Sequence, residues 1–502
     1  MRSILGRAGT VAAMVTALTL SAASSIAQSL EREIQSVLSQ ARLGSAQVGV
    51  SVQDAGTGEP LASINERAAL APASNLKLLT SGTALLVLGK DFEFRTRIVR
   101  DGDRLVIVGS GDPALADPKL LAKMGLTLEQ FLDRIAASIR DSGVTGVREI
   151  VVDDRVFDRD TIHASWPKNQ LNLWYCAPVT GLNFHTNVLE IYPSAGQRAG
   201  NAPTVRTVPS ARWIELVNRA RTVAAGSTSL WAAQEPGAEF RFTLYGELRA
   251  APEEPIEVTV REPGLLLARL LADRVGRLGL GIAGATPTVR PAADGEAAPA
   301  GPTVALVRTP ISEILERCNT DSQNLYAEAL LKRLGNVVTG QPGSWSNGST
   351  VVRMQINEKL GPEAGDLVMT DGSGLARDNR VTPVMLASWL GILYRDPNLS
   401  PLFVRSMASS AEGRLRQRFK DKKLTNEVHA KTGFIRGVLC LSGYVVNPST
   451  GRAAAFSILV NNFPDNVPAS RVKEFHDEVV FAVDRWLSRQ PALQATVPAL
   501  GG

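Results

Sequence analysis

The helices and strands expected at the two ends of the chain limit its fold more than any other sequence feature. At the N-terminal end, two short strands with alternating or apolar residues form a hairpin that has a helix on each side. At the C-terminal end, two long apolar strands precede an amphipathic helix. In chain order, these elements are residues 30–41, 47–53, 61–65, 72–88, 438–446, 453–461 and 469–487. The pattern predicts an α/β (α+β) fold in which both chain ends contribute strands to one antiparallel sheet flanked by helices.

The middle of the chain predicts a large, mostly β insertion into that domain. Residues 91–302 contain short strands and hairpin signals such as Asp101-Gly102, with helices near 126–142 and 264–278. Ala, Pro and Gly dominate residues 283–302, a composition typical of a linker or loose loop.

A long helical pattern then resumes at Pro310 and continues to about Gly335. The segments on the two sides of the insertion therefore predict one discontinuous domain, over residues 28–90 and 303–490. One or two inserted domains are expected over residues 91–302, and a C-terminal tail over residues 491–502.

The first residues have the composition of an export signal. Arg2 and Arg7 give a positive start, residues 8–23 are apolar, and Ser25-Ile26-Ala27 is a small-x-small cleavage site. The alternative is a membrane anchor, but Thr and Ser residues make this apolar run too short and too polar to span a bilayer well. We expect residues 1–27 to be removed, the mature protein to be periplasmic, and no transmembrane segment to remain.

Composition and charge disfavour several classes of protein. The 54 Lys and Arg residues exceed the 49 Asp and Glu residues by little, and no basic tract contains interleaved aromatic residues, which disfavours nucleic-acid binding. His and Cys residues lack metal-site spacing, so we expect neither a metal ion nor another cofactor. The odd set Cys176, Cys318 and Cys440 leaves at least one thiol unpaired or paired between chains, and favours three small buried side chains.

Three short motifs occur in a fixed order along the chain. They are an S-x-x-K at residues 74–77, an S-x-N at residues 322–324 and a K-T-G at residues 431–433. The same trio characterises class A β-lactamases and penicillin-binding proteins, which transfer acyl groups through a serine.

Further copies of the first two motifs lie in unsuitable contexts. Residues 165–168 also form an S-x-x-K, but Pro167 disfavours a helix there. Residues 63–65 also form an S-x-N, but they lie in an expected strand. Ser74 and Lys77 instead lie in the first turn of an expected helix, where side chains three residues apart share a face.

The first motif supplies a nucleophile and a base. A serine hydroxyl is a poor nucleophile unless a base lies within hydrogen-bond reach, and Lys77 meets this need for Ser74 when its amine is neutral. Burial and the neighbouring cation Lys431 both favour the neutral amine. The helix N-terminus places partial positive charge near Ser74, where an oxyanion would develop.

The other two motifs supply groups for the leaving amine and the substrate. We expect Ser322 to relay a proton to the leaving amine, and Asn324 either to fix a substrate amide or to hold Lys77. Lys431 and Thr432 would bind a free substrate carboxylate. Gly433 would let backbone and substrate approach closely.

Several segments resemble the low-molecular-mass class C penicillin-binding proteins, the D-Ala-D-Ala carboxypeptidase/endopeptidase family. The resemblance runs from about Ala46 to the last helix and is weakest over residues 196–254. The segments that carry it are Ala71–Lys77, Gly109–Pro113, Asp321–Glu328, Asp371–Leu375 and His429–Gly433. The resemblance implies a transpeptidase-like fold with a large insertion and an acyl-enzyme on Ser74. It also implies peptidoglycan stem peptides as substrates and β-lactams as covalent inhibitors.

Two positions depart from the family pattern. Phe434 follows the K-T-G where family members usually have Thr or Ser. A backbone N–H from residue 434 would serve an oxyanion hole whatever side chain the residue has. The hydroxyl that Thr or Ser at this position would offer to the terminal carboxylate of the substrate is missing. Residues 411–415, Ala-Glu-Gly-Arg-Leu, replace a D-G-T-L-like turn and affect local loop contacts only.

Two other functions stay open from the sequence. A β-lactamase or esterase with the same trio would differ in how fast the acyl-enzyme hydrolyses. A non-catalytic wall-binding protein of the same fold is favoured only by Phe434, and the five intact polar residues of the motifs disfavour it. Within the favoured function, the balance of carboxypeptidase and endopeptidase activity stays open.

Overall fold

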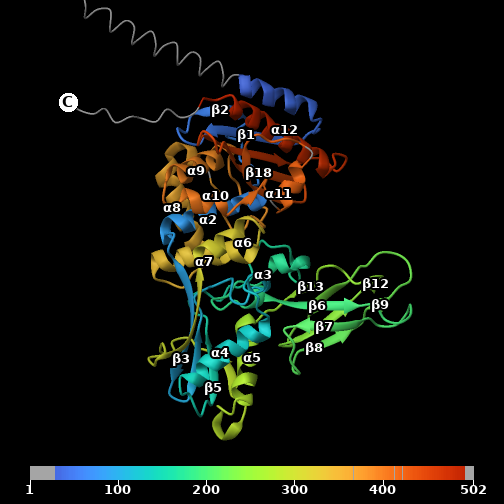
Figure 1. Cartoon of the computed structure of the whole chain (residues 1–502), viewed down its shortest axis with the longest axis vertical. Coiled ribbons are helices and arrows are strands. Elements are labelled where there is room, and N and C mark those ends of the chain that lie inside the picture. Colours follow the sequence, from blue (N-terminus) through green and yellow to red (C-terminus); the bar gives the residue numbers. More distant parts are fainter. Residues whose placement is uncertain (1–28, 366, 412, 421, 492–502) are drawn as a thin grey trace, which may run out of the picture.

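The computed structural model describes residues 29–365, 367–411, 413–420 and 422–491; the expected export signal and the tail from residue 492 lie outside them. In Figure 1, strands and helices from the two chain ends, blue and red, pack together, and the middle of the chain extends away from them. The strands that the two ends contribute are β1 (Gln47–Asp54), β2 (Pro60–Ile64), β16 (Ala408–Ser409), β17 (Glu427–Ile435), β18 (Val438–Val446) and β19 (Ala453–Asn461). They form one antiparallel sheet in the order β16-β17-β18-β19-β1-β2, which confirms the predicted fold class.

Helices cover both faces of this sheet. Val50 and Leu441 on one face pack in a core with α12 (Ala469–Ser488) and with the helix over residues 29–40. Tyr444 on the other face packs in a core with the remaining helices. These helices are α2 (Lys77–Leu88), α6 (Ile311–Asn319), α7 (Asn324–Thr339), α8 (Trp345–Leu360), α9 (Pro383–Arg395) and α10 (Ser400–Arg405), and α11 (Gly413–Phe419) lies beside β16. Because both faces are buried, β18 and β19 are apolar along nearly their whole length instead of at alternate positions.

The single helix expected over residues 310–335 is wrong, because the chain forms two helices there, α6 and α7. Between them, Ser322 has a φ of +62°, a left-handed conformation that an α-helix does not contain. Asp321, in the same turn, forms ion pairs with two cations outside α7. Charge pairing thus interrupts a helical pattern that is continuous in the sequence.

The helix expected from residue 72 begins as a tighter turn. Ala73–Leu76 form a 3-10 turn, η1, and the α-helical part starts at Lys77. A Cβ added to Gly374 would lie 1.8 Å from the carbonyl oxygen of Ala73, and Gly374 has a φ of +82°. Both space and conformation therefore require glycine where this loop packs on the turn that holds Ser74.

The middle of the chain folds into several smaller sheets (Figure 1). Its strands are β3 (Glu93–Asp101), β4 (Arg104–Val108), β5 (Glu149–Asp153), β6 (Val188–Ser194), β7 (Thr204–Val208), β8 (Glu215–Asn218), β9 (Arg221–Thr222), β10 (Trp231–Gln234), β11 (Arg241–Tyr245), β12 (Glu247–Leu248), β13 (Ile256–Thr259), β14 (Thr288–Pro291) and β15 (Thr303–Pro310). Its helices are α3 (Pro118–Lys123), α4 (Leu128–Asp141) and α5 (Pro263–Arg277), and the last two lie close to the helices expected from the sequence. The sheets have the orders β14-β5-β4-β3-β15, β13-β6-β7, β10-β11-β8 and β12-β9.

Strand pairing differs from the expected boundary at residue 303. β15 pairs antiparallel with β3, so residues 303–310 lie in the five-stranded sheet and not in the sheet that holds the two chain ends. The strand that enters the middle segment and the strand that leaves it are therefore neighbours, which brings the chain back beside its starting point. The division of the chain into domains otherwise stays a prediction.

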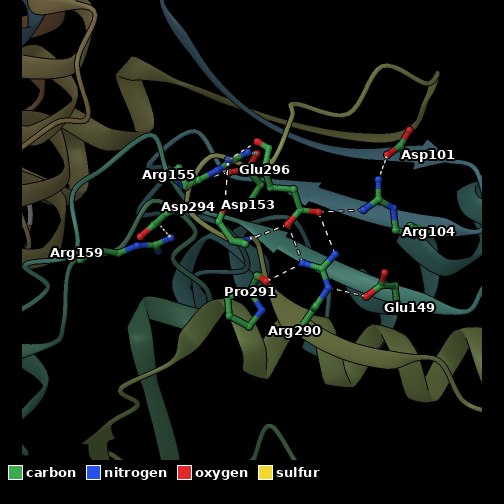
Figure 2. A network of polar contacts seen from close by, with 11 residues as sticks. Asp101, Arg104, Glu149, Asp153, Arg155, Arg159, Arg290, Pro291, Asp294 and Glu296 are labelled. Carbon is green, nitrogen blue, oxygen red and sulfur yellow. Dashed lines mark hydrogen bonds and ion pairs between the residues drawn. The ribbon is translucent and has the colours of Figure 1, made fainter.

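Residues 283–302, expected to be a loose loop, contain β14, which pairs with β5 in the five-stranded sheet, and Glu296 adds side-chain contacts to that sheet (Figure 2). The Glu296 carboxylate accepts two hydrogen bonds from Arg290, at 2.8 and 3.0 Å, and one from Arg104 at 3.0 Å. Arg155 binds the Glu296 carbonyl oxygen. The hydrogen bonds from Arg290, with help from the backbone N–H of Ala293, lower the pKa of Glu296 to about 2. Composition alone predicts none of these contacts.

We expect Glu296→Gln to lower the free energy of unfolding at neutral pH by about 1 kcal/mol, the range of a well-ordered surface charge network. Because the folded pKa lies below the ordinary 4.5, this contribution is present above pH 4.5 and is lost as pH falls toward 2. Urea unfolding of both proteins at several pH values measures the difference. It should shrink in acid, and Glu253→Gln, at an exposed glutamate of the same region, should show no such trend. A difference that stays constant with pH contradicts the role of the charge.

Candidate active site

Ser74 and Lys77 lie in direct contact at the start of α2. Ser74 is half-buried in η1, whereas Lys77 is fully buried. The Lys77 Nζ donates hydrogen bonds to three acceptors, at 3.0 Å to Ser74 Oγ, 2.7 Å to Asn324 Oδ1 and 2.9 Å to the carbonyl oxygen of Ser373. These three bonds use all three N–H groups of the protonated amine, so the buried charge has a full set of hydrogen-bond partners.

Burial makes Lys77 a stronger candidate for a base than an exposed lysine. Desolvation lowers the pKa of Lys77 from 10.5 to about 8, and Cys318, Glu328 and Asp371 oppose part of that shift. At pH 7, roughly one-tenth of the Lys77 side chains are therefore neutral, far more than for an unperturbed lysine.

Lys431, from the third motif, is also buried and lies near Lys77. It is an inward-facing residue of β17, and its Nζ donates a hydrogen bond of 2.9 Å to the carbonyl oxygen of Thr432. Burial first, and the charge of Lys77 second, lower the pKa of Lys431 well below its ordinary value. The charge of Lys77 therefore disfavours the charge of Lys431, whereas it is burial, and not Lys431, that lowers the pKa of Lys77.

The turn with Ser322 joins α6 to α7 and is held by charges. The Arg317 guanidinium binds Asp117 at 2.7 Å and also pairs with Asp321, and Lys119 pairs with Asp321 at 3.0 Å. Ser322 is half-buried in this turn. The ion pairs hold the turn in place between α3 and α7, at the end of α7 that faces Lys77.

Asn324, at the first position of α7, bridges two segments. Its Oδ1 accepts the bond from Lys77, and its Nδ2 donates a hydrogen bond of 2.8 Å to the carbonyl oxygen of Tyr175. Of the two roles open from the sequence, this geometry favours the one in which Asn324 holds Lys77.

β17 approaches the nucleophile so closely that Gly433 has no room for a side chain. An added Cβ would lie 2.9 Å from the carbonyl oxygen of Pro72 and 3.1 Å from the backbone nitrogen of Ser74. Thr432 and Phe434 point the other way and are exposed, Phe434 to 64%. The strand β16 pairs only with residues 429 and 430 of β17, so the rest of that edge faces no other strand within the described part of the chain.

The structure adds one group that sequence reasoning missed, the carbonyl oxygen of Ser373. The segment Asp371–Leu375 carried part of the family resemblance with no role of its own, yet it supplies the third acceptor of Lys77. A backbone oxygen leaves no signature in a sequence, so the resemblance of this segment to the family was the one available signal.

Among the described residues, the thiols and the usual metal-ligating side chains form neither a disulfide nor a metal-binding group. Cys176, Cys318 and Cys440 are unpaired and buried, as favoured from the sequence. Over the described residues, no three His, Cys, Asp or Glu side chains gather as metal ligands do. Likewise, none of the helices in that part of the chain is long and apolar enough for a bilayer.

Comparisons with known proteins identify the family of the chain. Residues 30–483 match the D-Ala-D-Ala carboxypeptidase 3 (S13) family. The chain is 32% identical, over 88% of its length and 82% of the relative's, to a D-alanyl-D-alanine carboxypeptidase of Actinomadura sp. (strain R39). The crystal structure of penicillin binding protein 4 (dacB) from Haemophilus influenzae matches with a TM-score of 0.72 at 20% identity, covering 90% of this chain and 99% of that one. The same protein complexed with a β-lactam matches with a TM-score of 0.67 at 19% identity, with the same coverage. The chain therefore belongs to the D-Ala-D-Ala carboxypeptidase 3 (S13) family, as the resemblance of its motifs predicted.

Proposed function

We propose that this protein is a serine D-Ala-D-Ala carboxypeptidase that cleaves peptidoglycan stem peptides through an acyl-enzyme on Ser74. The observation that carries the proposal is the contact of 3.0 Å between Nζ of the fully buried Lys77 and Oγ of the half-buried Ser74. Membership of the carboxypeptidase family supports the substrate class.

The acceptors around Lys77 support its role as the base. Asn324 Oδ1 and the Ser373 carbonyl oxygen can only accept hydrogen bonds. When Lys77 is neutral, both of its N–H bonds go to these acceptors and its lone pair faces Ser74 Oγ. Lys77 then takes the hydroxyl proton while Ser74 attacks the carbonyl carbon of the penultimate D-Ala.

The other motif residues serve the oxyanion, the leaving group and the carboxylate. The backbone N–H groups of Ser74 and Phe434 donate to the oxyanion, since β17 lies against η1. Ser322 passes a proton to the leaving amine, and Lys431 and Thr432 bind the carboxylate of the terminal D-Ala. Water then hydrolyses the ester and frees Ser74.

The same chemistry makes β-lactams covalent inhibitors of this protein. Attack by Ser74 on the lactam carbonyl opens the ring, and the leaving nitrogen stays attached to the acyl group. The β-lactam complex of the Haemophilus influenzae protein supports this proposal through the shared fold. We also propose a periplasmic location, on the composition of residues 1–27, and no role for a metal ion or another cofactor.

We expect one covalent penicillin adduct per chain, and none in Ser74→Ala, because the ester forms on this oxygen alone. Intact-mass measurement after incubation with penicillin gives the result directly. Ser165→Ala, at the exposed serine of the second S-x-x-K, is the matched control and should keep the adduct. An adduct that persists in Ser74→Ala would show that another residue is the nucleophile.

Acylation should accelerate as pH rises and level off above about pH 8, since only neutral Lys77 accepts the Ser74 proton and its pKa is lowered to about 8. The rate of adduct formation with a fluorescent penicillin, followed across this range, gives the profile. Lys77→Met should lose both the rate and the rise. A rate that does not depend on pH near 8 contradicts Lys77 as the base.

The exposed Phe434 should decide part of the substrate preference. We expect Phe434→Thr to raise D-Ala release from monomeric pentapeptide about tenfold, the value of one hydrogen bond to a charged group, and to leave cleavage of cross-linked dimers unchanged. Chromatography of digested muropeptides separates the two activities.

Phe434→Leu is the control, because it reduces bulk without adding a hydroxyl. Equal gains in the Leu and Thr variants would assign the effect to size. No gain in either variant would remove Phe434 from the account of specificity.

A further inference from the structure

The acidic residue Glu328 lies near Lys77 and has no place in the reaction described so far. It is fully buried on α7, four residues after Asn324. Residues four apart share one face of a helix, so Asn324 and Glu328 face the same surroundings. Asn324 touches Lys77 directly, whereas Glu328 acts on its neighbourhood through other groups.

Glu328 holds the segment that supplies the third acceptor of Lys77. Its Oε1 accepts from the backbone N–H of Ser373, and its Oε2 accepts from the backbone N–H of Gly372, both at 2.8 Å. The indole N–H of Trp345 donates to the same Oε2, also at 2.8 Å. A buried carboxylate that binds three neutral donors and no cation is costly, which indicates a gain elsewhere.

Asp371 also binds the segment that contains Ser373. Its Oδ1 accepts from the backbone N–H of Gly374 at 2.9 Å, and its Oδ2 accepts from the indole N–H of Trp166 at 3.1 Å. The peptide unit between Ser373 and Gly374 is thereby fixed at both ends, by Asp371 at its N–H and by Lys77 at its carbonyl oxygen. The direction of that carbonyl determines where the lone pair of Lys77 points.

Titratable groups from four parts of the chain face Lys77. Cys318 faces it from α6, Glu328 from α7, Asp371 from the loop before α9 and Lys431 from β17. Glu328 in turn faces Asp371, Cys318 and the buried Lys332. Burial first, and the charge of Asp371 second, raise the pKa of Glu328 to about 7.

We propose that Glu328 is a positioning residue for acyl transfer. It fixes the Gly372–Ser373 backbone so that Lys77 faces Ser74, and its negative charge favours the ammonium form of Lys77. The inference rests on the proposed roles of Ser74 and Lys77. Glu328 touches neither the substrate nor the reacting atoms. Its geometric effect and its electrostatic effect can be measured separately, because different variants remove one or both of them.

Glu328→Gln tests both effects in the full chain. An amide nitrogen cannot accept, so at least one of the three donors loses its partner, and acylation by fluorescent penicillin should slow by about 10- to 100-fold. Loss of the negative charge should move the midpoint of the pH–rate profile down by about one unit. Glu358→Gln, the same change at the exposed end of α8, should alter neither value.

Glu328→Asp separates geometry from charge. It keeps the carboxylate but shortens the side chain, so the rate should fall while the midpoint stays at the wild-type value. Circular dichroism and the thermal midpoint establish that each variant is folded. If Glu328→Gln does not fold, the Asp variant decides the matter, since a wild-type rate in it contradicts the positioning role.

The outcomes distinguish this inference from the proposed function. A folded Glu328→Gln with the wild-type rate and midpoint overturns the positioning role and leaves Ser74 and Lys77 untouched. A fall in rate with an unmoved midpoint in the Gln variant overturns the electrostatic part. A penicillin adduct in Ser74→Ala instead overturns the proposed function itself.

Discussion

The burial of one lysine side chain among three fixed acceptors is the constraint on which the site depends. Removing the Lys77 ammonium from water costs free energy, and the three hydrogen bonds offset that cost while the charge is present. The remaining cost lowers the pKa of Lys77 to about 8. Because two of the acceptors cannot donate, loss of a proton leaves the lone pair directed at Ser74. The same geometry therefore stabilises the protonated form of Lys77 and makes its neutral form a base for Ser74.

The fold brings these groups together from distant parts of the chain. Ser74 precedes the middle segment, Asn324 and Ser373 follow it, and Gly433 belongs to a strand near the C-terminus. The pairing of β3 with β15 returns the chain beside its starting point, so a long middle segment can separate the motifs without separating their side chains. The ion pairs of Arg317 then hold the turn with Ser322 against α3, which lies in the middle segment. The middle segment is in this way part of the support of the site.

The sequence predicted the antiparallel sheet of both chain ends and the residues of the three motifs, because apolar runs and side-chain chemistry are visible in it. It did not predict the role of Ser373, which acts through a backbone oxygen, or the break at Ser322, where helical periodicity continues across a turn held by ion pairs. Residues 283–302 have the composition of a loose loop, yet they contain β14, which pairs with β5, and Glu296 binds Arg290 of that strand and Arg104 of β4. Contacts between distant segments are the physical element that local patterns lack.

The central claim is that burial makes Lys77 a base near neutral pH, and a direct titration tests it most sharply. Lysines labelled with ¹³C at Cε report their protonation by NMR, and Lys77→Met identifies the signal of this residue. We predict a lysine signal that titrates near pH 8, is absent from Lys77→Met, and is unchanged in the surface variant Lys359→Met. A Lys77 signal that titrates near the ordinary value of 10.5 would contradict the account, because the amine would then be almost fully protonated when the enzyme acts.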